Sequence, residues 1–232
     1  MKMHLAREFV AYAIDEGQEL WVWVDENSHK ALAAYNSAEG FDSVQIKGSI
    51  VPNAPGDTLV EAVFPNVTAI LDPSKKIIAD MNGKFDRAAL ATSPVKVVLE
   101  NEFVSVYNNA KSSREFILDP NQATEYINID QDPSTEDRNA FYWIMVARKY
   151  LTETLKYNGL NYKLGVYTNY GNHLDNAFFM PLTKTLSFGA GGTLLKNTAQ
   201  SRDVVIHELG HAVTTAIYGT VQNFEFNAMN EA

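Results

Sequence analysis

The first part of the chain alternates hydrophobic and polar residues, and this pattern predicts β-strands. The segment LWVWVD, residues 20–25, puts its two tryptophans on one face and two valines on the other, as the period of two in a strand requires. The turn residues DENS follow, and ALAAYN then resumes an apolar run. Another alternating run covers residues 6–14. We therefore expect a small hairpin, preceded by a further strand, within residues 1–43.

From about residue 44 to residue 118, short β-type runs follow one another between turns, and helical periodicity is almost missing. The runs are VQIKGSIV, DTLVEAVF, NVTAIL, KIIADMNGKF, VKVVLE and FVSVYN. Their spacing is typical of a small all-β sandwich. Asn82-Gly83 is the strongest hairpin signal, because both residues tolerate a positive φ.

After residue 119 the pattern becomes that of mixed α and β structure. The stretch RNAFYWIMVARKYLTETLKYNG, residues 138–159, has apolar residues at helical spacing, candidate N-caps before it and an Asn-Gly stop. KLGVYTNY, DNAFFMP and TLSFGAGG are predicted strands. A last helix is predicted over residues 201–218, with Ser201 or Asp203 as N-cap and Gly219 as C-cap. The chain therefore falls in the α+β class, with a β-rich N-terminal portion.

Composition narrows the classes of partner. With 232 residues, 46% of them hydrophobic, the chain can bury one sizeable core or two smaller ones. A net charge of −9 without a dense basic run argues against nucleic acid or an anionic membrane as partner. No stretch approaches the roughly 18 to 20 apolar residues of a transmembrane helix. Cysteine is absent, which leaves histidine and carboxylates as the metal ligands.

The most specific chemical signal is VVIHELGHAVTTAIYG, residues 204–219. On a helix, His207 and His211 lie on one face a single turn apart, so both imidazoles can bind one zinc ion. Glu208 points to a neighbouring part of that face and can act as general base on a water molecule at the metal. Zinc acidifies such a water and polarises a carbonyl group, so a peptide bond is a plausible target.

The competing interpretation is that these are ordinary polar residues on a surface helix. The apolar flanks of the motif predict instead a buried helix, whose polar side chains need partners that a metal would supply. Gly210 costs about 1 kcal/mol in the middle of a helix relative to alanine, which asks for a packing or access reason. The metal interpretation is therefore favoured.

HELGHAVT followed by NAMNEA resembles the thermolysin-type zinc endopeptidases, and LDNAFFMPLTKTLSFGAGG is similar to the edge strand and glycine-rich hairpin of that family. The run before HELGH also has fungalysin-like features. The resemblance implies that His207, His211 and Glu231 are the zinc ligands and that Glu208 is the general base. It implies that Asn176 and Ala177 bind the backbone of a polypeptide substrate along the edge strand. A structural role for these two residues, as a strand asparagine and a small core residue, stays an alternative.

The likeness covers roughly residues 120–232 and fits the earlier segments more loosely. Residues 1–43 resemble the end of a zymogen propeptide, and residues 44–118 resemble a small sandwich-like module. Residues 119–232 would then be the N-terminal subdomain of a metallopeptidase catalytic domain. The resemblance also implies an extracellular location, although the first residues lack the unbroken apolar core of a secretory signal.

Three departures from the family pattern stand out. Gln222 takes the place of a tyrosine that helps to stabilise the oxyanion, and the carboxylate that orients a ligand histidine has no counterpart. The C-terminal helical domain is also missing, so the sequence is interpreted as part of a longer peptidase precursor that is weak or inactive alone. Asp203 falls at a calcium-binding position, which makes calcium a candidate cofactor of the full-length protein, but the N-cap interpretation is favoured.

The leading hypothesis is therefore a zinc metalloendopeptidase. The first alternative is a non-catalytic, degenerate or truncated relative that acts as a binding or folding module. The second alternative is a metal-dependent hydrolase with a non-peptide substrate, which the motif fits less well.

Overall fold

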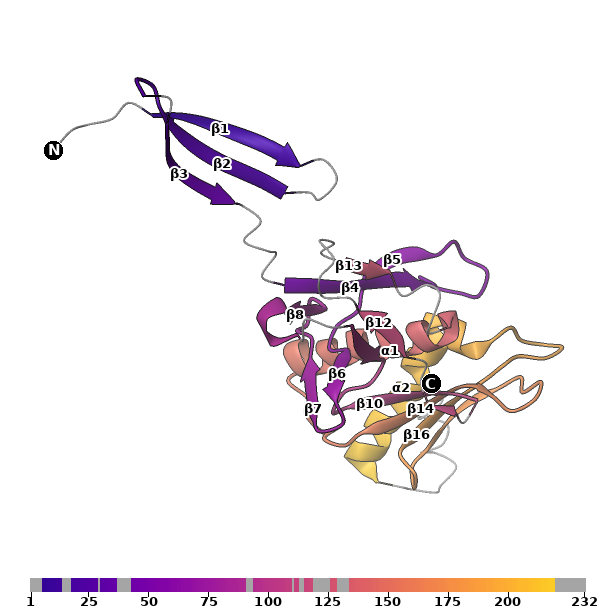
Figure 1. The fold of residues 1–232 in the computed structure, drawn as a ribbon. Helices are drawn as coiled ribbons and strands as arrows, with labels where there is room; N and C mark the ends of the chain where they lie inside the picture. The colour runs from indigo at the N-terminus through magenta and orange to yellow at the C-terminus, as the bar shows by residue number, and fades with distance from the viewer. Residues whose placement is uncertain are drawn as a thin grey trace.

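In the computed structural model the described residues are 6–13, 18–28, 30–36, 43–90, 94–109, 111–112, 115–118, 126–128 and 134–219. They form four β-sheets and two α-helices, shown in Figure 1. The α+β assignment made from the sequence is confirmed. No helix in these ranges has both the length and the apolar character needed to span a membrane.

The N-terminal strands form an antiparallel sheet of their own, at one end of the molecule in Figure 1. Its strands are β1 (Ala6–Ala13), β2 (Gln18–Asp25) and β3 (Ala31–Asn36), in the order β1-β2-β3. The turn after β2 is closed by Asp25, whose Oδ1 accepts hydrogen bonds from the backbone N–H groups of Asn27 and Ser28 at 2.9 and 2.7 Å. The predicted hairpin and its additional strand are therefore confirmed.

The β-runs between residues 43 and 118 are divided among three further sheets. The first contains β13-β4-β5 with β8 paired to β4, and its strands are β4 (Ser43–Ile50), β5 (Val60–Val63), β8 (Lys84–Asp86) and β13 (Tyr126–Asn128). The second has the order β12-β9-β6-β7, formed by β6 (Thr68–Asp72), β7 (Lys75–Ile78), β9 (Val95–Val98) and β12 (Phe116–Leu118). The short 3-10 turn η1 (Arg87–Ala89) follows β8.

The third sheet combines strands from both halves of the chain, in the order β11-β10-β14-β16-β15. Its strands are β10 (Val104–Asn108), β11 (Lys111–Ser112), β14 (Leu164–Tyr170), β15 (Ala177–Met180) and β16 (Thr185–Gly189). Strands β10 and β14 pair in parallel, and so do β14 and β16, whereas β15 pairs antiparallel with β16 alone and forms an edge.

The Asn82-Gly83 turn forms, but it does not make the predicted hairpin. Gly83 has φ +67, and its N–H donates to the carbonyl oxygen of Asp80 at 3.0 Å. The strands on either side separate, because β7 pairs with β6 whereas β8 pairs with β4 in another sheet. The turn therefore links two sheets, and Phe85 in β8 is buried in the core.

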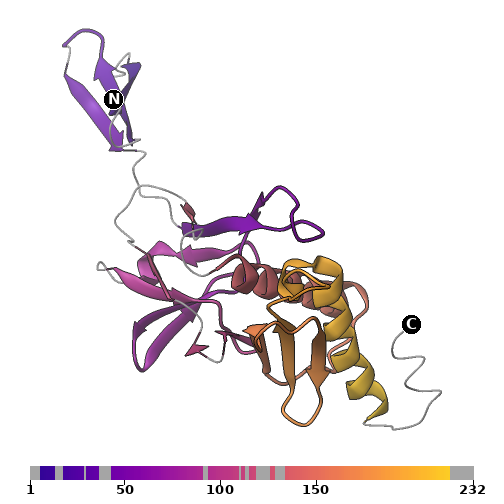
Figure 2. The same cartoon turned by 90° about the vertical axis from the view of Figure 1, so that its right-hand side faces the viewer.

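Helix α1 (Thr135–Lys149) lies between β4 and the five-stranded sheet in Figures 1 and 2 and contacts both. Ser134 caps its first turn, and Glu136 and Asp137 there suit the positive end of the helix dipole. The helix continues as a single π turn, η2 (Tyr150–Thr154), so the helical segment ends before the predicted Asn-Gly stop. Wider π turns disturb the i to i−4 ladder, and the chain leaves the helix there.

Helix α2 (Arg202–Tyr218) follows a 3-10 turn, η3 (Thr198–Gln200), and packs on α1 and β15. Its bounds agree with the predicted helix. The N-cap is Ser201, whose Oγ accepts from the N–H of Val204 at 3.5 Å, and the C-cap is Gly219 with φ +75. The N-cap interpretation of Asp203 is wrong, because Asp203 lies in the first turn and pairs with the adjacent Arg202 at 3.0 Å.

One buried apolar cluster runs from Val44 to Ala212 and includes residues from α1, α2 and all three of these sheets. It therefore contains side chains from both the 44–118 and the 119–232 segments. The division of the chain at residues 43 and 118 stays a prediction.

Candidate metal centre and substrate edge

Helix α2 carries the two histidines on the face that one helical turn predicts. The ring centroids of His207 and His211 are 4.5 Å apart, with the ring planes at 82°. His211 Nε2 lies 4.0 Å from a carboxylate oxygen of Glu208. Glu208 is buried, with 5% of its surface exposed, whereas His207 is exposed and His211 half-buried. The carboxylate of Glu208 is therefore buried next to two imidazoles that reach solvent.

These three side chains fit a metal ion. One potential ligand atom from each of His207, Glu208 and His211 lies within 4.8 Å of the others. Ligand atoms stand about 2.0–2.2 Å from zinc, so two ligands of one tetrahedral ion lie about 3.4 Å apart, and small side-chain rotations bring atoms within 4.8 Å to that separation. Imidazole nitrogens are also ligands that zinc prefers. The two histidines can therefore hold one ion on this face, with the Glu208 carboxylate close to it.

The helix is held by its opposite face. Val205, Leu209 and Ala212 are buried against the core, which fixes the direction in which the histidines point. The prediction of a buried helix is only partly right, since Ile206 is 39% and Ile217 is 54% exposed. Burial of one face is enough to orient the motif.

A cavity of about 410 Å³ joins the histidines to the edge strand β15. It is lined by Asn176, Ala177, Phe178, Phe179, Pro181, His207, Glu208, His211 and Thr215. Strand β15 has its second edge unpaired within the five-stranded sheet. An extended peptide can add to such an edge through backbone hydrogen bonds, so the cavity offers a peptide site next to a metal-binding group.

The family comparison agrees with this arrangement. Residues 74–215 match the family model described as thermolysin metallopeptidase, catalytic domain. The chain belongs to the thermolysin metallopeptidase family. The match covers more than half of the chain and includes both α1 and the histidine-bearing part of α2. No curated protein matches the chain. A metallopeptidase of this family acts on polypeptides and depends on zinc.

Most of the site residues expected from thermolysin-like peptidases lie together around the cavity. His207, Glu208, His211, Asn176 and Ala177 all line it. Glu231 and Gln222 lie outside the described residues. His173, on the loop before β15, is exposed and is not among the residues that line the cavity.

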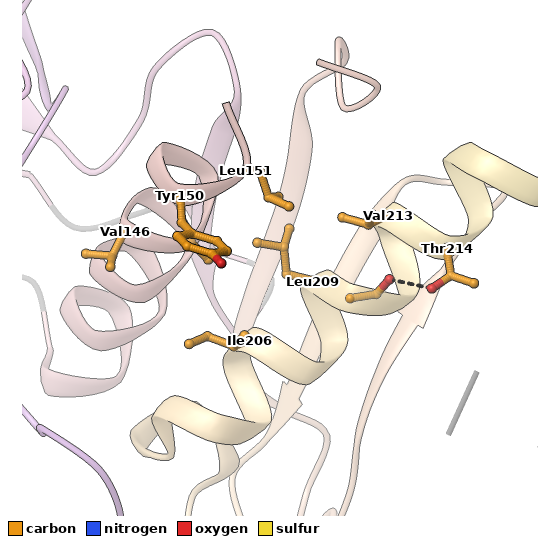
Figure 3. A pocket seen from close by; sticks show the side chains of 9 residues that line it. Val146, Tyr150, Leu151, Ile206, Leu209, Val213 and Thr214 are labelled. Atoms are coloured by element: carbon orange, nitrogen blue, oxygen red, sulfur yellow. Dashed lines mark hydrogen bonds between the residues drawn. The ribbon is translucent and has the colours of Figure 1, made fainter. Parts of the chain in front are cut away.

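A second, larger hollow of about 630 Å³ lies between α1 and α2, as Figure 3 shows. Its lining is almost wholly apolar and consists of Val146, Ala147, Tyr150, Leu151, Ile206, Leu209, Gly210, Val213 and Thr214. The α2 residues in this lining begin at Ile206 and recur every three or four positions, so they share one face of the helix. His207 and His211 are each displaced by one residue from that series and lie on a neighbouring face. Without an imidazole or carboxylate, this groove offers no metal site for the thermolysin-type chemistry.

Two features of the site were not predicted from the sequence. Phe179 and Pro181 line the cavity beside Ala177, and only the alternation along DNAFFMP could have placed Phe179 on the same side as Ala177. The second feature is Asp175, whose four backbone partners lie at the other end of the glycine-rich stretch. No short-range sequence pattern predicts contacts between residues 17 to 20 positions apart.

Proposed function

We propose that this chain is the zinc-binding and substrate-binding part of an endopeptidase that hydrolyses peptide bonds with a metal-activated water. The observation that carries the proposal is that His207, Glu208 and His211 face the same cavity as the edge strand β15, whose outer edge is unpaired within its sheet. Metal chemistry and an extended polypeptide would therefore meet in one place. Membership of a metallopeptidase family supports the same conclusion.

In this proposal His207 and His211 hold the zinc ion, with Glu231 as the third ligand. Zinc, when bound, lowers the pKa of water and polarises the substrate carbonyl group. Glu208 takes the proton from the attacking water and delivers it to the leaving amine. Its burial suits this role, because a carboxylate shielded from bulk water exchanges protons with the reacting groups and not with solvent.

Asn176 and Ala177 bind the substrate backbone in this proposal. Strand β15 supplies backbone donors and acceptors along its open edge, and the side chain of Asn176 is exposed beside the cavity. An extended substrate would lie antiparallel or parallel to β15 with alternate side chains directed towards the helix. Secretion, synthesis as a zymogen and calcium binding belong to the same proposal.

Zinc content and proteolysis of the purified chain test the proposal. We expect about one zinc per chain, lost in His207→Ala and in Glu231→Ala, and retained in His173→Ala. The matched control is His173, an exposed histidine near the same strand that does not line the cavity. Glu208→Gln keeps the size of the side chain, so it should retain zinc while casein cleavage falls by roughly 10²–10⁴-fold.

Each hypothesis predicts a different result. A folded chain without zinc would refute the metal site, and zinc binding without cleavage of casein or of furylacryloyl peptides would favour the non-catalytic module. Hydrolysis of a simple ester with no peptide cleavage would favour the non-peptide hydrolase.

A further inference from the structure

Asp175 holds four backbone N–H groups with one carboxylate. Oδ1 accepts hydrogen bonds from the N–H groups of Gly192 and Leu195 at 2.6 and 2.9 Å, and Oδ2 accepts from those of Thr193 and Leu194, both at 3.0 Å. These bonds, those from Leu194 and Leu195 above all, keep the pKa of Asp175 below its ordinary value. The carboxylate is therefore ionised at neutral pH, and all four N–H groups point at a negative charge.

The loop so bound connects the two sides of the candidate site. It begins after β16 and leads through η3 into α2, the helix of the histidines. Asp175 itself directly precedes Asn176 and Ala177, which line the cavity. The four hydrogen bonds thus join the start of the substrate edge to the segment that leads into the metal-binding helix.

Backbone contacts tighten the same junction. Gly191 N donates to the carbonyl oxygen of Leu174 at 3.1 Å, and Gly189 N donates to that of Asn176 at 2.9 Å. A Cβ atom on Gly192 would stand 2.9 Å from a carboxylate oxygen of Asp175, which is closer than real Cβ contacts come. Glycine at this position lets the loop approach the aspartate closely enough for both carboxylate oxygens to be used.

We propose that Asp175 is a positioning residue for the substrate, which fixes Asn176 and Ala177 relative to the histidine-bearing helix by clamping the 192–195 loop. This inference rests on the proposed peptidase function for its effect on catalysis. Asp175 touches neither the cavity nor the metal-binding group, so it acts through the backbone of its neighbours.

The test uses Asp175→Asn, which keeps the shape and replaces one acceptor oxygen with a donor. The NH₂ group of asparagine would face two N–H groups from which it cannot accept a hydrogen bond, while the remaining carbonyl oxygen can still accept from the other two. The matched control is Asp72→Asn, since Asp72 is an aspartate that also has a lowered pKa, and its Oδ1 closes a turn by accepting from the Ser74 N–H at 2.7 Å. Asp72 lies at the end of β6, which contributes no residue to the cavity.

The first readout is hydrogen exchange at the backbone amides of residues 192–195, which does not depend on catalysis. We expect faster exchange there in Asp175→Asn and unchanged exchange in Asp72→Asn. Equal protection in the wild type and Asp175→Asn would overturn the clamp.

The second readout is the separation of KM from kcat with casein. A misplaced edge strand should raise KM about 10-fold and leave kcat within about 2-fold, while zinc content stays constant. Furylacryloyl dipeptides, which are too short to follow β15, should show a smaller rise in KM. A loosened loop with unchanged KM, or an equal effect on short and long substrates, would overturn the positioning role.

Failure of the proposed function gives a different result from failure of this inference. If the wild-type chain cleaves nothing, binding of fluorescein-labelled casein to the Glu208→Gln chain replaces KM as the readout. An Asp175→Asn change added to that chain should weaken binding about 10-fold. Binding that stays the same would overturn the positioning role whether or not the chain is a peptidase.

Discussion

The buried side chain of Asn139 gives a direct test of how the histidine-bearing helix is held in place. Its Oδ1 accepts from the backbone N–H of Val51 at 2.9 Å, and its Nδ2 donates to the carbonyl oxygen of Ala199 at 2.7 Å. Asn139 and Ala199 are fully buried, and Val51 is 2% exposed. One amide thereby connects α1 to the segment after β4 and to η3, which leads into α2.

Asn139→Ala removes both hydrogen bonds and leaves a buried N–H and a buried C=O without this partner. Each unsatisfied group costs about 1–3 kcal/mol, so the free energy of unfolding should fall by about 2–5 kcal/mol, with the lower half favoured if water enters the space. Urea unfolding followed by tryptophan fluorescence measures this change. With a slope of about 2–3 kcal/mol per molar, the midpoint should fall by roughly 1 M at constant slope.

The matched control is Asn172→Ala, because Asn172 is exposed in the loop before β15. It should change the free energy of unfolding by no more than about 0.5 kcal/mol. If Asn139→Ala were as mild as Asn172→Ala, the two hydrogen bonds would not support the packing of η3 on α1, and the structural reasoning would be refuted.

Three further predictions concern single residues near the site. Gly210→Ala should raise the free energy of unfolding by up to about 1 kcal/mol in urea titrations, because nothing lies within 4 Å of the added Cβ; destabilisation would contradict this. Gly191→Ala should lower it by more than about 1 kcal/mol, because φ is +81 and a Cβ would stand 2.6 Å from Leu195 O; a neutral effect would show that the loop can relax. Because the folded pKa of Asp175 is lowered, its stabilisation should be complete above about pH 4 and be lost as the pH falls through the folded pKa. The difference in unfolding free energy between wild type and Asp175→Asn should therefore shrink on acidification, and a constant difference would contradict the lowered pKa.

Local signals in the sequence were enough to place α2 and its chemistry. The cap residues Ser201 and Gly219 bound the helix as predicted, and the spacing of His207 and His211 put both imidazoles on one face. Both results depend on contacts within a few residues, which helix geometry fixes. The extent of burial depends on what packs against the helix, and for that reason the predicted buried helix is buried on one face and exposes Ile206 and Ile217.

Pairing between distant strands could not be predicted in the same way. The run at β10 looked like one more strand of a sandwich, yet it pairs in parallel with β14, so that Val106 lies opposite Val166. The Asn82-Gly83 turn has the expected backbone, but its two strands enter different sheets. Alternation tells which face of a strand is buried and says nothing about which neighbour it pairs with.

The glycine-rich stretch shows what kind of long-range contact does leave a trace in the sequence. Gly189 and Gly192 lie against residues 173–176, where a Cβ on either would collide with backbone or carboxylate oxygen, whereas a Cβ on Gly191 would collide with the backbone of residues 195–197. A close contact between backbone atoms leaves no room for a side chain, so its trace in the sequence is glycine. The stretch FGAGG therefore records how closely the loop before the histidine-bearing helix approaches the start of the substrate edge. The glycines and Asp175 therefore hold the loop in place together. Replacing one of these glycines should loosen the loop in the same way as Asp175→Asn.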